Sequence, residues 1–397
     1  MSKKRRDSKN RVLRSGESQR KDGRYAYKYI DTFGNPQFVY AWKLVPTDKT
    51  PAGKREDISL REKVKDIQKD LDDGIDTIGK KMTVCQLYAK QIRHRGNVRY
   101  NTKNGRKRLM KLLEEDKLGG CPIDSVKLSD AKEWAIRMKE KGISYKTISN
   151  DKRSLKAAFY TAIQDDCIRK NPFDFQLNTV IEDDTEPKVP LTPAQEESFL
   201  SFAQNDKVYQ KYYDELIILL GTGLRISELC GLTDTDINFE NRIINVDHQL
   251  LRSAETGYYI ETPKTKSGIR QIPMSEKVYE AFNRVLKRRR GAKAVTIDGY
   301  SNFLFLNRDG YPKTATNYDG MFRGLAKKYN KYHEEALPKV MTPHTLRHTF
   351  CTNMANAGMN PKALQYIMGH SNITMTLNYY AHATFDSAKA EMLRIAA

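Results

Sequence analysis

The sequence has few cysteines, and none of them are paired. Five cysteines are scattered over 397 residues and never form a Cys-x-x-Cys pair. A zinc site needs clustered ligands, so this spacing predicts no bound metal. An odd number of scattered cysteines also excludes a disulfide framework and is typical of free thiols in a reducing compartment. We therefore expect a cytoplasmic protein that folds without crosslinks.

Long apolar segments are also missing. The longest strongly apolar run, Leu216 to Leu220, is far shorter than the ~20 residues of a membrane-spanning helix. Met1 is followed by a basic stretch with no apolar segment behind it, so we expect no signal peptide. No internal repeat or long low-complexity segment is evident. These absences argue against a membrane protein and a secreted one.

Positive charge is what the sequence has in excess. It carries 69 Lys and Arg against 49 Asp and Glu, a formal net charge of +20. A hydrophobic content of 39% is ordinary for folded protein, so the cations belong to folded surfaces rather than to a disordered tail. The length predicts two or three domains. A cationic surface of this kind indicates a polyanionic partner, and the lack of membrane features favours nucleic acid.

The first 80 residues form a small, very basic region. The first 30 residues hold eleven Lys and Arg against three Asp and Glu. Residues 25–30 and 37–42 alternate as strands do around a turn at 31–36, and 60–71 has a helical pattern. A two-stranded ribbon fits the major groove of DNA, although its aromatic side chains could instead form the core of this small domain. The DNA-binding candidates are Arg20, Lys21, Arg24, Lys28, Tyr40 and Trp42.

Residues 82–175 have a helical pattern. Thr83 is placed to cap one helix, residues 109–113 belong to a second, and 129–141 and 144–165 predict two more. Charges on a helix usually form a solvated face, but here neighbouring helices share the basic excess, which favours a surface that follows DNA phosphates. The candidates on the last helix are Lys146, Lys152, Arg153 and Lys156.

An acidic stretch at 181–187 that contains a proline predicts a linker. Thr192 and Pro193 then open a helix, as an N-cap and a first-turn proline do. Helices continue to 229, strands are predicted at 242–246, 258–260 and 270–273, and helices fill most of the remainder. The predicted domains are therefore 1–80, 81–183 and 184–397.

Histidines and arginines with anion-binding character lie in the last of these domains. Four of the seven histidines fall between His344 and His382. His344 and Arg347 are three apart near a helix start, so both address one anion. Arg225 opens a helix after a glycine-containing turn, a favourable place for phosphate, and Lys264 lies in a basic turn between two strands. Each signal is weak when taken singly.

Together, and in this order, these residues resemble one family. Arg225, a lysine on a β-turn, His344-x-x-Arg347, Gly369-His370 and a Tyr-x-His ending are similar to the pattern of tyrosine recombinases, or phage-type integrases. The similarity spans roughly 191–397 and, more loosely, the helical region before it. The basic ribbon resembles the arm-binding domain of integrases from conjugative transposons.

The resemblance implies a multidomain, mainly α fold with small β parts. The expected domains are an arm-binding domain of a small β-sheet plus a helix, a helical (SAM-like) core-binding domain, and a mixed α/β catalytic domain with a C-terminal tail helix. It also implies a tyrosine that attacks phosphorus and forms a 3′-phosphotyrosyl link, with neither ATP, metal nor any other cofactor. Two guanidiniums, Arg225 and Arg347, are suited to neutralising the transition state. His344 is then the proton acceptor or a partner of the oxyanion, and His370 is a donor to the phosphate.

Two assignments remain open at this point. Counting nine residues from His370 leads to Tyr379 and counting ten leads to Tyr380; the Tyr-x-His ending fits only Tyr380, which is therefore favoured as the nucleophile. For the acid that protonates the leaving oxygen, Lys264 is favoured over Lys266, two residues away.

The resemblance predicts a site-specific recombinase that excises and integrates a mobile element, a conjugative transposon. Its expected partners are double-stranded DNA at core and arm sites, further copies of itself in a tetramer that passes through a Holliday junction, and an accessory bending or excision factor. The expected location is the bacterial cytoplasm, at the nucleoid. The alternatives are a type IB topoisomerase, a non-enzymatic DNA-binding regulator on the same fold and, disfavoured by the lack of nearby paired carboxylates, a metal-dependent nuclease.

Overall fold

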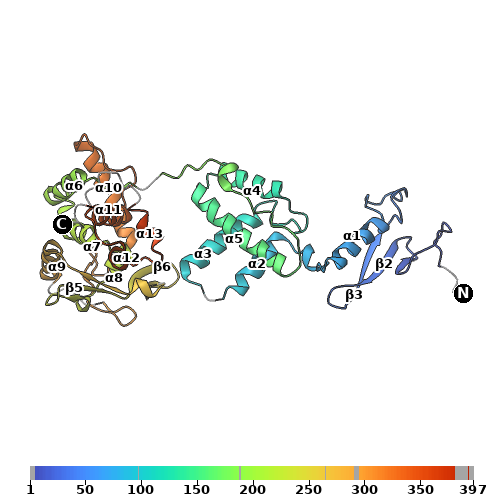
Figure 1. Cartoon of the computed structure of the whole chain (residues 1–397), viewed down its shortest axis with the longest axis horizontal. Helices are drawn as coiled ribbons and strands as arrows, with labels where there is room; N and C mark the ends of the chain where they lie inside the picture. The colour runs from blue at the N-terminus through green and yellow to red at the C-terminus, as the bar shows by residue number, and fades with distance from the viewer. Residues whose placement is uncertain are drawn as a thin grey trace. The chain divides into compact units, whose positions relative to one another are not determined.

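The structure is a computed structural model that describes residues 5–96, 98–186, 189–263, 265–289, 295–380 and 392. The chain divides into two compact units, Met1–Glu186 and Pro187–Ala397 (Figure 1). The boundary falls in the acidic stretch for which a linker was predicted. The expectation of a mainly helical chain with small sheets is confirmed.

The first unit begins with a three-stranded antiparallel sheet in the order β1-β2-β3, formed by Glu17–Gln19, Tyr25–Ile30 and Pro36–Ala41. Helix α1, Leu60–Asp72, packs on one face of it, where Tyr25, Ala41 and Leu60 form a small core. Side chains alternate between the faces of a strand. Tyr40 and Trp42 therefore project from the face opposite α1.

The rest of the first unit is helical. Helices α2 (Val84–His94), α3 (Tyr100–Glu114), α4 (Leu128–Glu140) and α5 (Tyr145–Gln164) surround a core that includes Trp134 and Phe159, with short 3₁₀ turns at Gly79–Lys81 (η1) and Leu177–Thr179 (η2). The Thr83 hydroxyl accepts a hydrogen bond from the Gln86 N–H at 3.2 Å, so the predicted N-cap is confirmed.

The second unit alternates helices with two small sheets. Its helices are α6 (Pro193–Asn205), α7 (Tyr213–Thr222), α8 (Ile226–Gly231), α9 (Glu276–Arg289), α10 (Ala315–Tyr332), α11 (Pro343–Asn356), α12 (Pro361–Met368) and α13 (Thr374–Leu377), with 3₁₀ turns η3 (Gln210–Tyr212), η4 (Asp234–Asp236) and η5 (Lys266–Gly268). Strands β4 (Ile237–Asn238), β5 (Ile243–Val246) and β8 (Arg270–Pro273) form one antiparallel sheet, and β6 (Gln249–Ser253) and β7 (Gly257–Glu261) form a hairpin. Strands β4 and β6 were not predicted, because β4 is only two residues long and β6 lacks a β-branched pattern.

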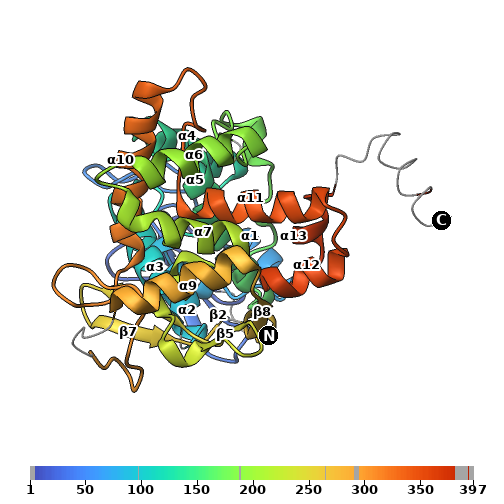
Figure 2. The ribbon, with the colours of Figure 1, turned by 90° about the vertical axis from the view of Figure 1, so that its left-hand side faces the viewer.

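Helix α7 lies between α9 and α11 (Figure 2). From Leu216 to Leu220 every residue is apolar, as is typical of a helix buried on several sides. It ends at Gly223 in the left-handed conformation, with φ of 64°. A Cβ at Gly223 would lie 2.4 Å from the Phe350 ring on α11. The glycine therefore allows α11 to approach closely and turns the chain toward Arg225.

All five cysteines are free thiols, and Cys167, Cys230 and Cys351 are buried. Among the helices of the described ranges, none is long and apolar enough to cross a membrane.

Candidate active site

Arg225 is the N-cap of α8, at the end of the turn that follows α7. Its backbone N–H and its guanidinium both donate to the Glu228 carboxylate, at 2.8 and 2.7 Å, and the guanidinium also donates to the Gly369 carbonyl at 3.1 Å. The Arg225 side chain remains 36% exposed. Glu228 therefore orients this arginine, and the guanidinium keeps a face open to a ligand.

Arg347 lies on α11, buried against the turn that carries Arg225. Its guanidinium donates to the backbone carbonyls of Gly223 and Met368, both at 2.5 Å. Burial, followed by the nearby charge of Arg225, lowers the pKa of Arg347 to about 9. Burial and the neighbouring cation therefore disfavour the charge of Arg347, and a bound anion would relieve this cost. His344, one turn earlier on α11, is exposed.

Glu228 carries the negative charge of this cluster. Its burial opposes ionisation, but Arg270, Arg225 and Arg347 together hold the pKa of the carboxyl at about 2. One carboxylate thus faces three guanidiniums. Three positive charges against one negative charge leave an excess of positive charge beside the exposed side of Arg225. This excess suits a phosphate whose negative charge grows during reaction.

His370 follows α12 and is almost completely buried, at 5% exposure. Burial, reinforced by Arg347, Arg225 and Arg270, lowers the pKa of its imidazole to about 4, so the ring is neutral at pH 7. Its Nδ1 lies 2.9 Å from the Thr376 hydroxyl. If that hydroxyl donates to Nδ1, the ring proton stays on Nε2 and is available to a phosphate oxygen.

Tyr379 and Tyr380 follow α13 and are both half-buried. The Tyr380 hydroxyl donates to the Met359 carbonyl at 2.5 Å. The Tyr379 ring instead contacts the His348 ring, with centroids 4.8 Å apart. Burial raises the pKa of both phenols, but the charge of Arg347 counteracts it only at Tyr379. The structure therefore places Tyr379 in the field of Arg347 and gives the Tyr380 hydroxyl a backbone partner.

Of the two candidate lysines, the structure describes only Lys266. Lys266 is exposed at the start of η5. Lys264 lies outside the described residues, as do His382 and nearly all of the predicted tail helix.

One residue of this cluster was missed from the sequence. Arg270 opens β8, and its fully buried side chain binds both oxygens of Glu228. The sequence pattern predicts Arg270 only as the first residue of the strand at 270–273. Its signal was present, because alternation along β8 places Arg270 on the same, inward face as the apolar Ile272. An arginine at an inward strand position requires a buried partner.

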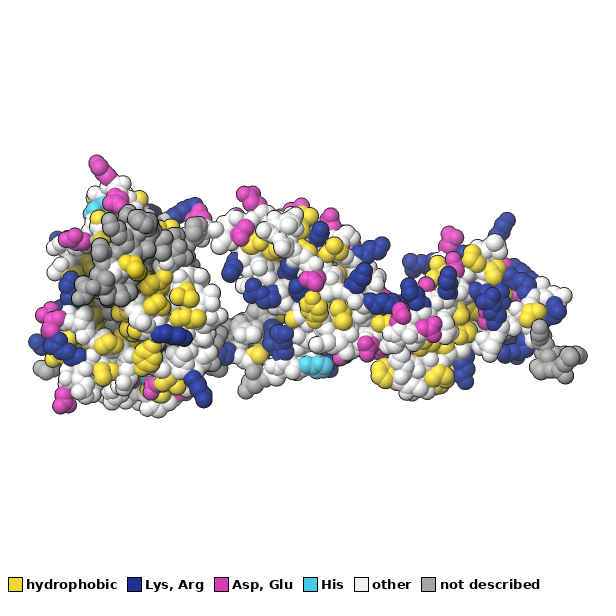
Figure 3. All heavy atoms as spheres, in the orientation of Figure 1, with side chains coloured by type: hydrophobic (Ala, Val, Ile, Leu, Met, Phe, Trp, Pro, Cys, Tyr) yellow, Lys and Arg dark blue, Asp and Glu magenta, His cyan; other side chains and the backbone are white. Residues whose placement is uncertain are grey.

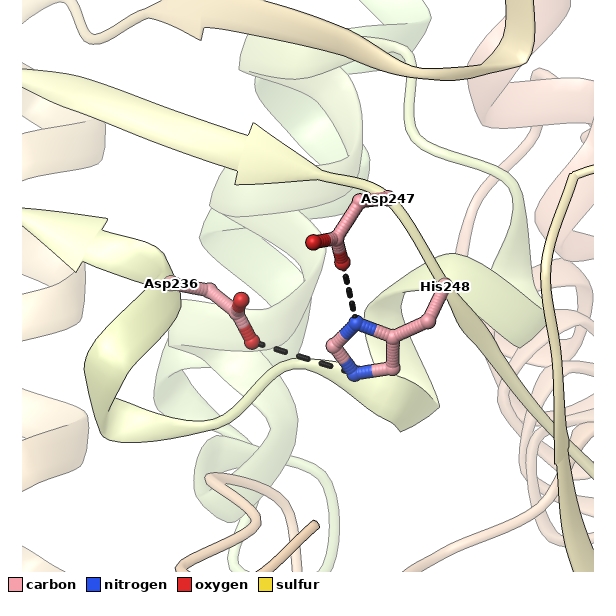
Figure 4. Close-up of side chains that lie close together, drawn as sticks. All are labelled: Asp236, Asp247 and His248. Carbon is pink, nitrogen blue, oxygen red and sulfur yellow. Dashed lines mark hydrogen bonds and ion pairs between the residues drawn. The ribbon is translucent and has the colours of Figure 1, made fainter. Parts of the chain in front are cut away.

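Asp236, Asp247 and His248 form a second group of titratable side chains (Figure 4). Their ligand atoms lie within 4.8 Å of one another. However, His248 Nδ1 lies 2.6 Å from Asp247 Oδ1, and its Nε2 lies 2.7 Å from the Gly231 carbonyl. The Asp236 carboxylate accepts hydrogen bonds from the backbone N–H and the hydroxyl of Thr233. Both ring nitrogens are engaged, so the group ties the β5–β6 connection to the end of α8 and does not form a metal site.

The basic ribbon carries cations over aromatic rings on the face opposite α1. The guanidiniums of Arg20 and Arg24 lie 5.2 and 5.4 Å from the Tyr40 ring, and Arg24 is also 5.8 Å from Trp42. Lys21 and Lys28 are exposed. Lysine and arginine side chains are dense on the visible face of this N-terminal part (Figure 3).

The four candidates on α5 differ in their contacts. Lys146 and Arg153 are exposed. The Lys152 ammonium donates to the Phe175 carbonyl at 2.5 Å, and burial lowers its pKa. Lys156 pairs with Asp174 at 2.5 Å. The last two therefore hold the segment after α5 in place.

Comparison with known proteins agrees with this geometry. A model of the phage integrase family matches residues 190–387, and a model described as the DNA binding domain of tn916 integrase matches residues 1–71. The transposase from transposon Tn916 of Enterococcus faecalis is 69% identical over 395 residues, which cover 100% of this chain and 97% of that relative. This chain belongs to the phage integrase family of tyrosine recombinases. It is therefore an enzyme that breaks and rejoins DNA.

Two solved structures resemble this tyrosine recombinase. One is described as Tn1549 transposon integrase (aa 82–397, R225K) in complex with a circular intermediate DNA; it is 78% identical, covers 79% of this chain and 99% of that chain, and has a TM-score of 0.76. The other carries Y379F and is in complex with transposon right end DNA; it is 78% identical, covers 80% and 100%, and has a TM-score of 0.75. This recombinase has Arg225 and Tyr379 at those numbers.

Thr376 offers a test of the state of His370. Thr376→Val keeps the shape but removes the hydroxyl, so the Nε2–H tautomer loses its preference and we expect DNA cleavage to slow by about tenfold. Thr376→Ser keeps the hydroxyl and should retain most of the rate. Single-turnover cleavage by the two variants measures the difference; equal rates would contradict the assignment.

The low pKa of His370 makes the folded protein sensitive to acid. Its folded-state pKa of about 4 lies below the ordinary value, 6.5, so between these pH values the unfolded chain binds a proton that the folded chain does not. Stability is therefore lost as pH falls, by at most about 1.4 kcal/mol per pH unit from this residue. An NMR titration of ¹³C-labelled histidines, with His370→Gln to assign the signal, should show His370 neutral at pH 5. Titration near pH 6.5 would contradict the buried, neutral state.

Proposed function

We propose that this recombinase excises and integrates a conjugative transposon by cutting duplex DNA at the ends of the element. The observation that carries the proposal is the convergence of Arg225, Arg347 and His370. Tyr379 is the nearby phenol: burial raises its pKa, and the charge of Arg347 partly offsets that rise. The 69% identity to the Tn916 transposase and the DNA complexes of the Tn1549 integrase support it.

In the proposed step, the Tyr379 oxygen attacks the scissile phosphorus. A bond forms between that oxygen and phosphorus, the bond from phosphorus to the 5′ oxygen breaks, and the protein holds the 3′ phosphate. The phenol proton passes to His344, and the leaving 5′ oxygen takes a proton from Lys264, with Lys266 as the alternative. Attack by a 5′ hydroxyl from another strand reverses the step, so neither ATP nor metal is consumed.

The guanidiniums stabilise the transition state of this step. In the proposed complex, the guanidiniums of Arg347 and Arg225 donate hydrogen bonds to the phosphate oxygens, and His370 donates from Nε2. Because these donors are fixed before the substrate arrives, they stabilise the developing charge without reorganisation. Removing one such donor costs about 10²–10³ in rate in enzymes of comparable design.

Two observations make Tyr379 the proposed nucleophile in place of Tyr380. The Tyr380 hydroxyl would have to leave the Met359 carbonyl, whereas Tyr379 already lies in the field of Arg347. The Tn1549 integrase was solved with Y379F in complex with transposon right end DNA. Replacing the nucleophile would prevent cleavage and keep such a DNA complex intact, which supports Tyr379.

The DNA contacts are divided among three domains in this proposal. Residues 1–80 bind arm sites through the ribbon face, 81–183 bind the core site, and 184–397 hold the scissile phosphate. The proposed contacts are Arg20, Lys21, Arg24, Lys28, Tyr40, Trp42, Lys146 and Arg153, while Lys152 and Lys156 act through the segment that they hold. We expect a tetramer on the DNA, an accessory bending or excision factor, and action at the bacterial nucleoid.

The ribbon face can be tested with a matched pair of lysines. Lys28→Ala removes an exposed cation from this face, whereas Lys65→Ala removes an exposed cation from α1 on the other face. We expect only Lys28→Ala to weaken arm-site binding, several-fold, and to reduce the salt dependence by about one phosphate contact. Fluorescence anisotropy between 50 and 200 mM salt measures both; equal effects of the two variants would contradict the ribbon interface.

The proposed reaction is tested with a duplex of the element end that carries a nick beside the cleavage position. The nicked fragment diffuses away after cleavage, so the covalent complex accumulates on a denaturing gel. We expect the adduct in EDTA and without ATP, and only with the element sequence. Loss of the adduct in EDTA would contradict the mechanism, and equal cleavage of unrelated DNA would indicate a topoisomerase.

A further inference from the structure

Arg270 is one of the most deeply buried charged residues of the described ranges. Its side chain is fully buried, so it cannot touch DNA. Its guanidinium makes four hydrogen bonds: to the two Glu228 oxygens at 3.1 and 2.8 Å, to the Gly268 carbonyl at 3.0 Å and, through Nε, to the Ile367 carbonyl at 2.6 Å. These acceptors belong to three separate segments of the chain.

The first of these segments holds Arg225. Glu228 accepts from Arg270 on one side and from Arg225 on the other, so one carboxylate is shared between two guanidiniums. Arg270 fixes the orientation of the carboxylate, and the carboxylate fixes Arg225. The fork of Arg270 is suited to this bidentate contact, and a lysine cannot reproduce it.

The second segment is the turn that contains Lys266 and follows Lys264 in the chain. It ends at Gly268, which is buried and whose carbonyl accepts from Arg270. A Cβ at Gly268 would lie 2.3 Å from Pro263, so the turn packs closely on the residue before Lys264. The base of the turn that carries Lys266 is therefore attached to Arg270.

The third segment leads to His370. Arg270 binds Ile367 near the end of α12, and Gly369 follows with a left-handed φ of 61°. A Cβ on Gly369 would lie 3.1 Å from Arg270 Nη1 and 3.0 Å from the Ser267 carbonyl. The glycine of the Gly369-His370 pair therefore leaves room for this arginine. Its carbonyl also accepts from Arg225, which closes the network.

We infer that Arg270 is a positioning residue that sets Arg225, the lysine turn and His370 in register around the scissile phosphate. This inference rests on the proposed function. Without Arg270 the three segments lose their common anchor. Arg225 is then the only guanidinium that donates a hydrogen bond to Glu228 in the described contacts, and the carboxylate draws it toward the interior. A displacement of about 1 Å in a catalytic group is enough to lower a rate by about 10²-fold.

The experiment compares two nicked element ends in single-turnover cleavage by the full chain. One has the natural 5′ oxygen as the leaving atom, and the other has a 5′-bridging sulfur, whose thiolate leaves without needing a proton from lysine. We expect Arg270→Met to cleave the oxygen substrate about 10²-fold more slowly. With the sulfur substrate, the loss of rate in Arg270→Met should be at least about tenfold smaller, because the sulfur leaves without a proton from the displaced lysine.

Three controls separate positioning from stability. Ile272→Ala truncates the next inward side chain of β8 and should lower the melting temperature with a rate within about threefold of wild type. Glu228→Gln/Arg270→Met removes both buried charges and should regain stability but not activity. Arg270→Lys keeps the charge without the fork and should show an intermediate loss with the same partial recovery on sulfur.

Two results would overturn the inference. One is a rate in Arg270→Met or Arg270→Lys that follows only the folded fraction, with the wild-type ratio of oxygen to sulfur cleavage. The other is full activity in the double variant. Failure of the proposed function is a separate outcome, because the wild-type protein would then form no adduct with either substrate.

Discussion

Tyr379→Phe removes the covalent adduct with nicked element DNA, and Tyr380→Phe keeps it. This result is expected because Tyr379 is the phenol that lies in the field of Arg347, and no other group can replace its oxygen in the bond to phosphorus. We expect the adduct to fall by at least about 10⁴-fold in Tyr379→Phe. A denaturing gel after an overnight reaction measures this range.

Tyr380→Phe is the matched control, since the two substitutions remove the same atom from neighbouring residues. Its cost is the hydrogen bond to the Met359 carbonyl, worth about 1 kcal/mol of stability. We expect adduct formation within about threefold of wild type. The reversed pattern, with Tyr380→Phe inactive and Tyr379→Phe active, would restore the assignment that the Tyr-x-His ending favoured.

Arg347→Gln separates activity from stability. Arg347 is a buried cation whose pKa is lowered, because burial and the neighbouring Arg225 disfavour its charge in the folded protein. Its replacement by a neutral side chain relieves that cost, although the carbonyls of Gly223 and Met368 lose donors. We therefore expect little change in melting temperature together with a loss of cleavage of about 10³-fold.

A methylphosphonate at the cleavage position tests why Arg347 matters. This substrate replaces one charged non-bridging oxygen by a neutral methyl group, so less charge accumulates in the transition state. The penalty for Arg347→Gln should shrink from about 10³-fold to about tenfold if the guanidinium acts by neutralising that charge. An unchanged penalty would show that Arg347 supports the fold of the site instead.

Local signals in the sequence were sufficient for much of the fold. The caps at Thr83 and Thr192 were predicted because a cap depends on residues within one turn, and both are present. Arg225 was placed at a helix start for the same reason, since the glycine turn before it is local. The spacing of His344 and Arg347 places both in the first turns of α11.

The contacts that the sequence did not predict join distant segments. Arg270 and Glu228 lie 42 positions apart, and nothing near either residue specifies the partner. The choice between Tyr379 and Tyr380 depends on how the chain leaves α13, because neighbouring residues point in different directions there. The helical pattern predicts an exposed basic face that includes Lys152 and Lys156. In the structure the segment after α5 folds back and contacts both side chains.

The central claim is that Tyr379 becomes covalently attached to DNA. The most direct measurement traps the adduct of the wild-type chain on a nicked element end, digests the DNA and the protein, and sequences the modified peptide by tandem mass spectrometry. The account predicts one modified residue, a nucleotide phosphate on Tyr379, in material formed with EDTA present. A modification on Tyr380 or on a histidine, or an intact cleaved product with no modified peptide, would contradict it.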